Sequence, residues 1–164
     1  MADSGYVREV YEASYRRLVA QAYAVTGDRT EAEDAVQEAF ARAVAAGDRF
    51  GRVDNPEAWL RTVALNVVRR RWRRSRMFRS LGPRIASPAE VPGISEDHVA
   101  VVQAMRSLPF QQREVLALFY VADLSVQEIA TMLGVASGTV KSRLNRGRAA
   151  LGALVGANVE ADHG

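Results

Sequence analysis

The sequence predicts an all-α protein made of two small helical domains joined by a flexible linker. Apolar residues recur at the spacings of three and four that are typical of amphipathic helices, whereas the alternating pattern of a strand never persists. Between residues 75 and 95, glycine and proline interrupt every periodic segment, which is typical of a linker. We therefore expect a first domain over residues 6–74, a linker over 75–95 and a second domain over 96–155.

Three helices are expected in the first domain, over about residues 6–26, 30–47 and 56–74. Thr30 and Glu33 form a potential capping box at the start of the second helix, in which each side chain bonds the other's backbone N–H. The third helix opens on Asn55 and Pro56, because asparagine is a favoured N-cap and proline is favoured at the first helical position. The inward-facing residues expected in the second helix are Ala35, Val36, Ala39, Phe40, Ala43 and Val44.

Four helices are expected in the second domain, one around residues 99–105 and others beginning near Pro109, Ser125 and Ser137. Ser125 and Glu128 form a second potential capping box, and Gly134 ends the short helix that follows. A short capped helix, a turn and a further helix have the proportions of a helix-turn-helix, whose second helix enters the major groove of DNA.

On a helical wheel, the helix from Ser137 has an apolar face and a polar face. The residues that should face the core lie within about 60° of one another and are Val140, Leu144, Gly147 and Leu151. The opposite arc carries donor-rich side chains that suit phosphates and base edges, namely Lys141, Ser142, Asn145 and Arg146. Arg143 and Arg148 flank the apolar stripe and should reach either the DNA backbone or the partner helix. The alternative is a helical hairpin whose outer face is merely basic.

Positive charge is concentrated in two segments. The formal net charge is only +3, with 21 arginines and one lysine. Residues 61–84 nevertheless carry nine arginines and no acidic residue, and residues 141–150 carry four basic residues and no acidic one. Each segment is attached to an otherwise acidic part of the chain, which indicates two contacts with a polyanion. The alternative is that they are solvated helix ends favoured by the helix dipole.

The helix from Pro56 has one polar edge on an otherwise apolar surface. Its members lie at spacings of four, three and four and are Thr62, Asn66, Arg69 and Arg73. Such an edge favours contact with nucleic acid. The preceding loop adds Phe50, Arg52 and Asn55, and an aromatic ring or an arginine can stack on unpaired bases. The alternative for Phe50 is a position in the core or as an anchor of the loop.

A third surface is acidic. Glu31, Asp34, Gln37 and Glu38, with Ala41 among them, lie opposite the apolar stripe of the second helix. Such a face repels DNA, so we expect it to meet either solvent or the basic surface of a protein partner.

Composition excludes several classes of protein. The chain contains no cysteine, so disulfides, thiolate metal sites and cysteine nucleophiles are absent. Its two histidines have no evident set of carboxylate co-ligands, and no phosphate-binding glycine loop occurs. No apolar run approaches the length of a membrane span, and the N-terminus lacks the features of a signal peptide. We expect a cytoplasmic protein that is not an enzyme, with no cofactor, no metal and no membrane insertion.

A resemblance to a known family is carried by AEDAVQEAF at 32–40, WLRTVALN at 59–66 and GTVKSRLNRGR at 138–148. These motifs resemble those of the extracytoplasmic-function (ECF) sigma factors, the minimal class of bacterial transcription initiation factor. In that family the first motif binds the clamp helices of the largest RNA polymerase subunit, and the second contacts the melted nontemplate strand of the minus-ten element. The third belongs to the helix-turn-helix that contacts the minus-thirty-five element. Further similarity to that helix-turn-helix region lies at residues 108–109, 113–115, 124–125 and 128–130.

The resemblance implies a role for each of the three surfaces. The residues implied to bind core polymerase are Asp34, Gln37, Glu38 and Ala41. Those implied to bind the minus-ten element are Phe50, Arg52, Asn55, Thr62, Asn66, Arg69 and Arg73. Those implied to bind the minus-thirty-five element are Ser137, Thr139, Lys141, Ser142, Asn145, Arg146 and Arg148. It also implies an anti-sigma factor as a regulatory partner and promoter DNA as both duplex and melted strand. Because few residues follow the core of the last helix, we do not expect the small extra C-terminal domain of some subfamilies.

The sequence departs from the family pattern at two positions of the helix-turn-helix. Ala136 stands where relatives often have proline, and Asn145 stands where they often have an aromatic or basic residue, so the part of Asn145 in base recognition is open. Two other functions are also open at this level. One is the output domain of a response regulator, which shares the Glu-Ile-Ala and Thr-Val-Lys patterns, and the other is a helical adaptor that binds only protein.

Overall fold

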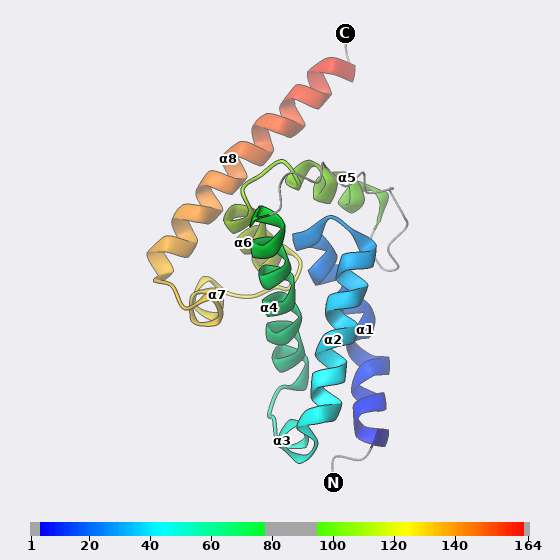
Figure 1. The fold of residues 1–164 in the computed structure, drawn as a ribbon. Coiled ribbons are helices and arrows are strands. Elements are labelled where there is room, and N and C mark those ends of the chain that lie inside the picture. Colours follow the sequence, from blue (N-terminus) through cyan, green and yellow to red (C-terminus); the bar gives the residue numbers. More distant parts are fainter. Residues whose placement is uncertain (1–3, 78–94, 163–164) are drawn as a thin grey trace. The chain divides into compact units, whose positions relative to one another are not determined.

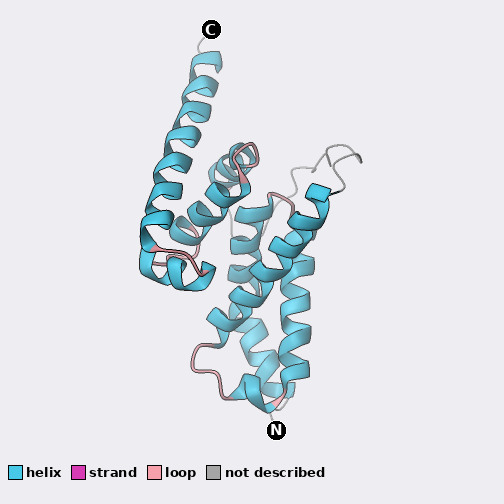
Figure 2. Cartoon of the chain, turned by 60° about the vertical axis from the view of Figure 1, so that its left-hand side comes forward, coloured by secondary structure: helices cyan, strands magenta, loops and turns pink. Residues whose placement is uncertain are grey.

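The computed structural model describes residues 4–77 and 95–162. Within these residues the chain forms α-helices joined by short loops and no strand, which confirms the all-α prediction (Figure 2). The chain divides into two compact units, residues 1–93 and 94–164, which we describe separately. The predicted linker lies largely outside the described residues, although its first residues belong to a helix that continues to Met77.

The described residues of the first unit form four helices, α1 (Ser4–Thr26), α2 (Arg29–Ala46), α3 (Asp48–Gly51) and α4 (Pro56–Met77). The three long helices pack side by side, with α2 in contact with both α1 and α4 (Figure 1). The fully buried residues along α2 are mostly small, namely Ala32, Ala35, Ala39 and Ala43. Small side chains let the helix axes approach closely, because the distance between axes depends on the side chains at the contact.

The start of α2 differs from the sequence prediction. Its N-cap is Asp28, whose carboxylate accepts a hydrogen bond from the backbone N–H of Glu31 at 3.1 Å. The predicted capping box of Thr30 and Glu33 is therefore wrong. Glu33 instead accepts a hydrogen bond from Nε of Arg29 at 2.7 Å, one helical turn away. Aspartate is as good an N-cap as serine or asparagine and comes first along the chain, so the N-cap lies two residues earlier than predicted.

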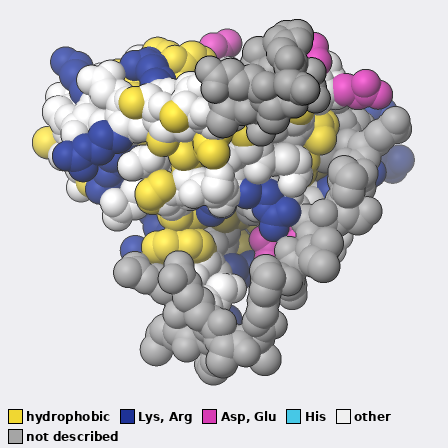
Figure 3. All heavy atoms as spheres, turned by 90° about the horizontal axis from the view of Figure 1, so that it is seen from above, with side chains coloured by type: hydrophobic (Ala, Val, Ile, Leu, Met, Phe, Trp, Pro, Cys, Tyr) yellow, Lys and Arg dark blue, Asp and Glu magenta, His cyan; other side chains and the backbone are white. Residues whose placement is uncertain are grey.

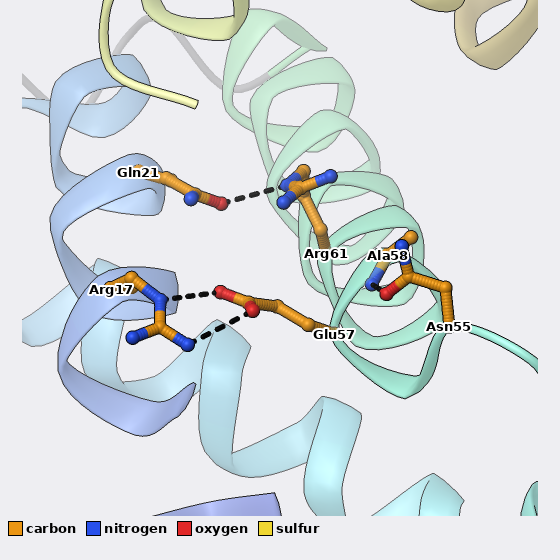
Figure 4. A network of polar contacts seen from close by, with 6 residues as sticks. All are labelled: Arg17, Gln21, Asn55, Glu57, Ala58 and Arg61. Atoms are coloured by element: carbon orange, nitrogen blue, oxygen red, sulfur yellow. Dashed lines mark hydrogen bonds and ion pairs between the residues drawn. The ribbon is translucent and has the colours of Figure 1, made fainter. Parts of the chain in front are cut away.

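Side chains from α1 hold the first two turns of α4 in place (Figure 4). Arg17 donates two hydrogen bonds to the Glu57 carboxylate, at 2.9 and 3.0 Å, and Nε of Arg61 donates to the Gln21 side chain at 2.9 Å. Asn55 caps the helix as predicted, since its Oδ1 accepts the backbone N–H of Ala58 at 3.0 Å. The Arg17 guanidinium lowers the pKa of the Glu57 carboxyl, and Glu57 in turn raises the pKa of Arg17.

The second unit contains α5 (Glu96–Met105), α6 (Phe110–Tyr120), α7 (Val126–Leu133) and α8 (Ser137–Asp162). The α8 helix packs against the other three. The capping box of Ser125 and Glu128 is present with both of its hydrogen bonds, and Gly134 ends α7 in the left-handed conformation, at φ 67°. The helix-turn-helix predicted at α7 and α8 is therefore formed.

Gly147 marks the closest approach of α8 to α6. A Cβ atom at this position would lie 2.9 Å from Cδ1 and 3.2 Å from Cγ of Leu116. Leu116 is itself buried, so it has little room to move aside. The crossing of the two helices thus depends on the absence of a side chain at Gly147.

Replacing Gly147 with leucine should lower the free energy of unfolding of the full chain by about 2 kcal/mol, because the new side chain overpacks the contact with Leu116. Urea unfolding followed by circular dichroism measures this. The matched control is Gly152→Leu in the same helix, where nothing lies within 4 Å of a Cβ atom. Equal losses in the two variants would show that the packing at Gly147 is not what matters.

Replacing Glu57 with glutamine should lower the free energy of unfolding by about 0.5 kcal/mol at neutral pH, since the ion pair is partly exposed. Because the folded pKa of Glu57 lies below its ordinary value of 4.5, the pair stabilises the fold above that pH. This contribution is lost as the pH falls through the lowered pKa, so wild type and variant should converge in acid. Glu9→Gln, at an exposed position on α1, serves as the control and should show no such dependence.

Candidate nucleic-acid interface

The outer surface of α8 presents the polar side chains that the helical wheel predicts. We use the name α8 face for Lys141, Ser142, Asn145 and Arg146. Ser142 is half-buried and the other three are exposed, whereas Val140 and Leu144 on the opposite side are buried in the core of the unit. The first turn of the helix adds Ser137 and Thr139, both half-buried. The face is therefore rich in donors and displayed by a helix fixed on its other side.

Arg148 lies beside this face and is held by the neighbouring helix α6. Its Nε donates a hydrogen bond to the Tyr120 hydroxyl at 2.6 Å. Its guanidinium carbon lies 5.4 Å from the centre of the Phe119 ring and 5.5 Å from that of Tyr120, which is cation–π distance. Nη1 also donates to Oδ1 of Asn145 at 3.3 Å. The sequence left two alternatives for Arg148, contact with the DNA backbone or with the partner helix. The structure shows contact with the partner helix, which is α6.

The polar edge predicted on α4 lies on the side away from the buried residues of that helix. We use the name α4 edge for Thr62, Asn66, Arg69 and Arg73. Asn66 and Arg73 are exposed, and Arg69 donates to Oδ1 of Asn66 at 3.3 Å. Thr62 is half-buried, and its hydroxyl donates to the backbone carbonyl of Ala58 at 3.0 Å. The α4 edge is thus a continuous row of polar side chains, in which the Asn66 amide and the Arg69 guanidinium are in contact.

The position of Phe50 contradicts its predicted contact with DNA. Its side chain is fully buried, at 0% exposed, and its ring centre lies 5.9 Å from that of Tyr6 and 5.1 Å from that of Trp59. A ring enclosed in this way has no face left for an unpaired base. Phe50 therefore anchors the loop in the core, which was the alternative to stacking on unpaired bases. Arg52 and Asn55 in the same loop are exposed, so the loop still offers polar side chains.

The predicted acidic surface on α2 is less acidic than its sequence suggests. We use the name α2 face for Asp34, Gln37, Glu38 and Ala41. Asp34, Gln37 and Ala41 are exposed. Glu38 is half-buried and lies close to three arginines, with N–O distances of 2.8 Å to Arg42, 3.5 Å to Arg71 and 3.9 Å to Arg70. Its charge is therefore largely balanced within the protein, and Asp34 is the exposed carboxylate of the face.

An apolar groove of about 490 Å³ runs beside the α2 face, between α1 and α2. Tyr11, Phe40, Ala41 and Val44 are among its lining residues. Val44 was expected to point into the core, but it is 64% exposed and its side chain forms part of the groove. The groove has no signal in the sequence, because helical spacing is the same for an apolar residue buried in the core and for one that stays exposed on the surface.

Tyrosines of α1 connect the groove to the α2 face. The Gln37 amide lies 3.4 Å from the hydroxyl of Tyr15 and 3.5 Å from that of Tyr11, and the two tyrosine rings stack on each other. Partial burial raises the pKa of the Tyr15 hydroxyl above its ordinary value of 10.0. A protonated tyrosine hydroxyl can serve as a donor or an acceptor. Gln37 is therefore held in one orientation at the rim of the groove.

Basic side chains are spread over the surface in several groups. On the face drawn in Figure 3, clusters of lysine and arginine lie among hydrophobic and uncharged side chains.

Among the residues that the structure describes, no three His, Cys, Asp or Glu side chains come together as a potential metal site. None of the helices described for this chain is both long enough and apolar enough to span a lipid bilayer.

Comparison with protein families matches both units of the chain. The model described as "Sigma-70 region 2" matches residues 10–77, and the model described as "Sigma-70, region 4" matches residues 98–151. The first match contains the α2 face and the α4 edge, and the second contains the α8 face.

Individual relatives and solved structures give the same result. The ECF RNA polymerase sigma factor SigL of Mycobacterium tuberculosis is 35% identical in an alignment of 153 residues that covers 88% of this chain and 85% of SigL. SigW of Bacillus subtilis, with the same description, is 32% identical over 162 residues, covering 89% of this chain and 82% of its own.

Two solved structures share the fold. The sigma factor RpoE, in complex with the anti-sigma factor NepR from Bartonella quintana, has a TM-score of 0.74 at 30% identity, covering 92% of this chain and 96% of its own. CnrH, in complex with the cytosolic domain of CnrY, has a TM-score of 0.65 at 26% identity, covering 94% of this chain and 90% of its own. On these similarities, and on two helical units that each carry a separate polar surface, the chain belongs to the ECF RNA polymerase sigma factors.

Proposed function

We propose that this sigma factor docks on core RNA polymerase through the α2 face and the adjoining groove, and contacts the promoter with both units. In this proposal α8 binds the duplex minus-thirty-five element, and the α4 edge with the preceding loop binds the melted minus-ten element. The observation that carries the proposal is the separation of surfaces: two donor-rich faces on α4 and α8, and on α2 a face whose exposed charge is the carboxylate of Asp34.

The docking surface combines apolar area with a few polar groups. Val44 and Ala41 offer exposed apolar contact, while Asp34 and Gln37 line the same side of α2 with an acceptor and an amide. Interfaces of this kind gain affinity from buried apolar anchors and gain orientation from complementary charge. An α-helix with basic side chains beside an apolar stripe fits this surface, and we assign that role to the clamp helices of the largest polymerase subunit.

The upstream contact follows from the placement of α8. The helix begins directly after the turn of the helix-turn-helix, which is the position of a recognition helix in the major groove. Lys141 and Arg146 are exposed cations that suit phosphates, and Ser142 and Asn145 suit base edges. Ser137 and Thr139 lie in the first turn of the helix and complete the proposed contact.

The downstream contact uses α4 and its loop. Arg52 and Asn55 are exposed polar side chains beside the start of α4, which the Arg17–Glu57 pair fixes, and Asn66, Arg69 and Arg73 continue the surface along the helix. Extruding a base from the stack costs a few kcal/mol, so a rigid set of donors that binds the extruded base assists melting. Phe50 supports this loop from inside and takes no part in the contact.

The two contacts reinforce each other when both units are bound to polymerase. We assign residues 6–74 and 96–155 to the two functional domains. Each contact alone involves few charges, so the isolated sigma factor should bind promoter DNA weakly, while simultaneous engagement multiplies the affinities.

Sigma factors are initiation factors without catalytic chemistry of their own, and we infer that this chain acts in the cytoplasm and has no enzymatic activity.

Control by an anti-sigma factor belongs to the same proposal. RpoE and CnrH, which share the fold, were solved in complex with NepR and with the cytosolic domain of CnrY. The exposed groove between α1 and α2 offers apolar surface that a regulator can occupy in competition with polymerase.

Run-off transcription with core polymerase on promoters of the source genome tests the proposed function as a whole, and failure on all of them, with no binding to core, would refute it.

Asp34→Arg should weaken binding to core polymerase at least tenfold, because the change reverses the exposed charge of the docking surface. Binding is measured by fluorescence anisotropy of the labelled sigma factor titrated with core. Glu9→Arg is the matched control, since it makes the same charge reversal at an exposed position on α1 that does not line the groove. Unchanged affinity in the Asp34 variant would refute the assignment of this face.

Changing Lys141 and Arg146 together to alanine should weaken holoenzyme binding to a minus-thirty-five duplex and reduce the slope of log K against log salt by roughly 2, since two phosphate contacts are lost. The slope is obtained from titrations at several salt concentrations. Arg16→Ala, at an exposed arginine of α1, is the control and should leave the slope as it is. If the double variant retains the wild-type slope, α8 does not neutralise the phosphates of the upstream duplex.

A further inference from the structure

Arg148 determines which hydrogen-bonding groups of Asn145 face outward. The two residues lie three positions apart on α8, so their side chains meet on one side of the helix. Nη1 of Arg148 lies 3.3 Å from Oδ1 of Asn145. A guanidinium group has only donors, so the group of Asn145 that faces it must be the carbonyl oxygen. The amide nitrogen, with its two N–H donors, is then left for an outside partner.

Arg148 is itself held by α6 and not by Asn145 alone. The hydrogen bond from its Nε to the Tyr120 hydroxyl is 2.6 Å long, and the Phe119 and Tyr120 rings both lie against its guanidinium. Tyr120 is 57% exposed, so burial in the core does not account for its position, and its main described partner is this arginine. The chain of contacts from Tyr120 through Arg148 to Asn145 fixes the orientation of the Asn145 amide.

This orientation matters for the recognition of bases. A free asparagine prefers adenine in the major groove, because its oxygen accepts from N6 while its nitrogen donates to N7. At Asn145, an adenine amino group that approached the oxygen would also meet the N–H groups of Arg148, donor facing donor. Guanine offers two acceptors at O6 and N7, and thymine offers one at O4. Both suit a site whose outward groups are mainly donors, because Arg148 already donates to the Asn145 oxygen and its N–H groups stand beside that oxygen's second lone pair.

We propose that Asn145 selects guanine or thymine, and disfavours adenine, at one position of the upstream element, and that Tyr120 and Arg148 are positioning residues that set this preference. The inference rests on the proposed function of α8 as the helix that enters the major groove.

The test is selection of bound duplexes from a library with a randomised upstream element, using holoenzyme assembled from the full chain. With wild type we expect guanine or thymine to exceed adenine roughly tenfold at the position in question, as one base contact of this kind provides. Asn145→Ala should remove the preference at that position alone. Arg148→Met frees the Asn145 oxygen and should shift the preference toward adenine, and Tyr120→Phe should shift it in the same direction by less.

The controls separate the possible results. Gln111→Ala, at an exposed position of α6, should select the wild-type element, and thermal unfolding by circular dichroism confirms that each variant is folded. The inference is overturned if wild type selects adenine at the position that depends on Asn145, or if Asn145→Ala leaves every position unchanged. If wild-type holoenzyme enriches no upstream element at all, the proposed function of α8 fails together with the inference, which is a distinguishable result.

Discussion

Close approach of helices is the constraint on which both units depend. In the first unit, α2 packs through the alanines Ala32, Ala35, Ala39 and Ala43, and in the second, α8 crosses α6 where Gly147 has no side chain. Units of this size bury a modest share of their surface, so tight contact between few helices must supply most of the stability. Each helix therefore commits one face to its neighbours, and the opposite faces of α2, α4 and α8 carry the exposed polar residues on which the proposed function rests.

Charge is distributed so that the same chain can bind both a protein and DNA. Arginines dominate the end of α4, yet Arg70 and Arg71 lie near Glu38, so part of their charge is balanced inside the first unit. Such exposed pairs contribute little to stability. Their effect is to reduce the net positive charge along this part of α4, and with it the attraction of the free chain for polyanions.

Long helical periodicity predicted which face of a helix is buried, whereas short or ambiguous patterns did not predict the burial of individual residues. The faces of α8 follow from a regular wheel, and Asn55 and Ser125 cap their helices because their chemistry is unambiguous. Phe50 belongs to the short helix α3, which is too brief to show a pattern, and only tertiary contact with α1 and α4 reveals that it is buried. Val44 has the correct spacing for the core, but no described part of the chain covers it. The contacts of Arg148 join positions 28 residues apart and have no local signal.

The groove between α1 and α2 also bears on how long the protein survives in the cell. An apolar surface left open invites association and, through transient unfolding, degradation. A partner that binds only the folded chain adds stability by mass action, about 2.7 kcal/mol when its concentration is 100 times its dissociation constant. If polymerase or a regulator occupies this groove, as we propose, each also acts as a ligand that stabilises the folded sigma factor. Its abundance would then track the total supply of both, so that excess copies without either partner are the ones removed first.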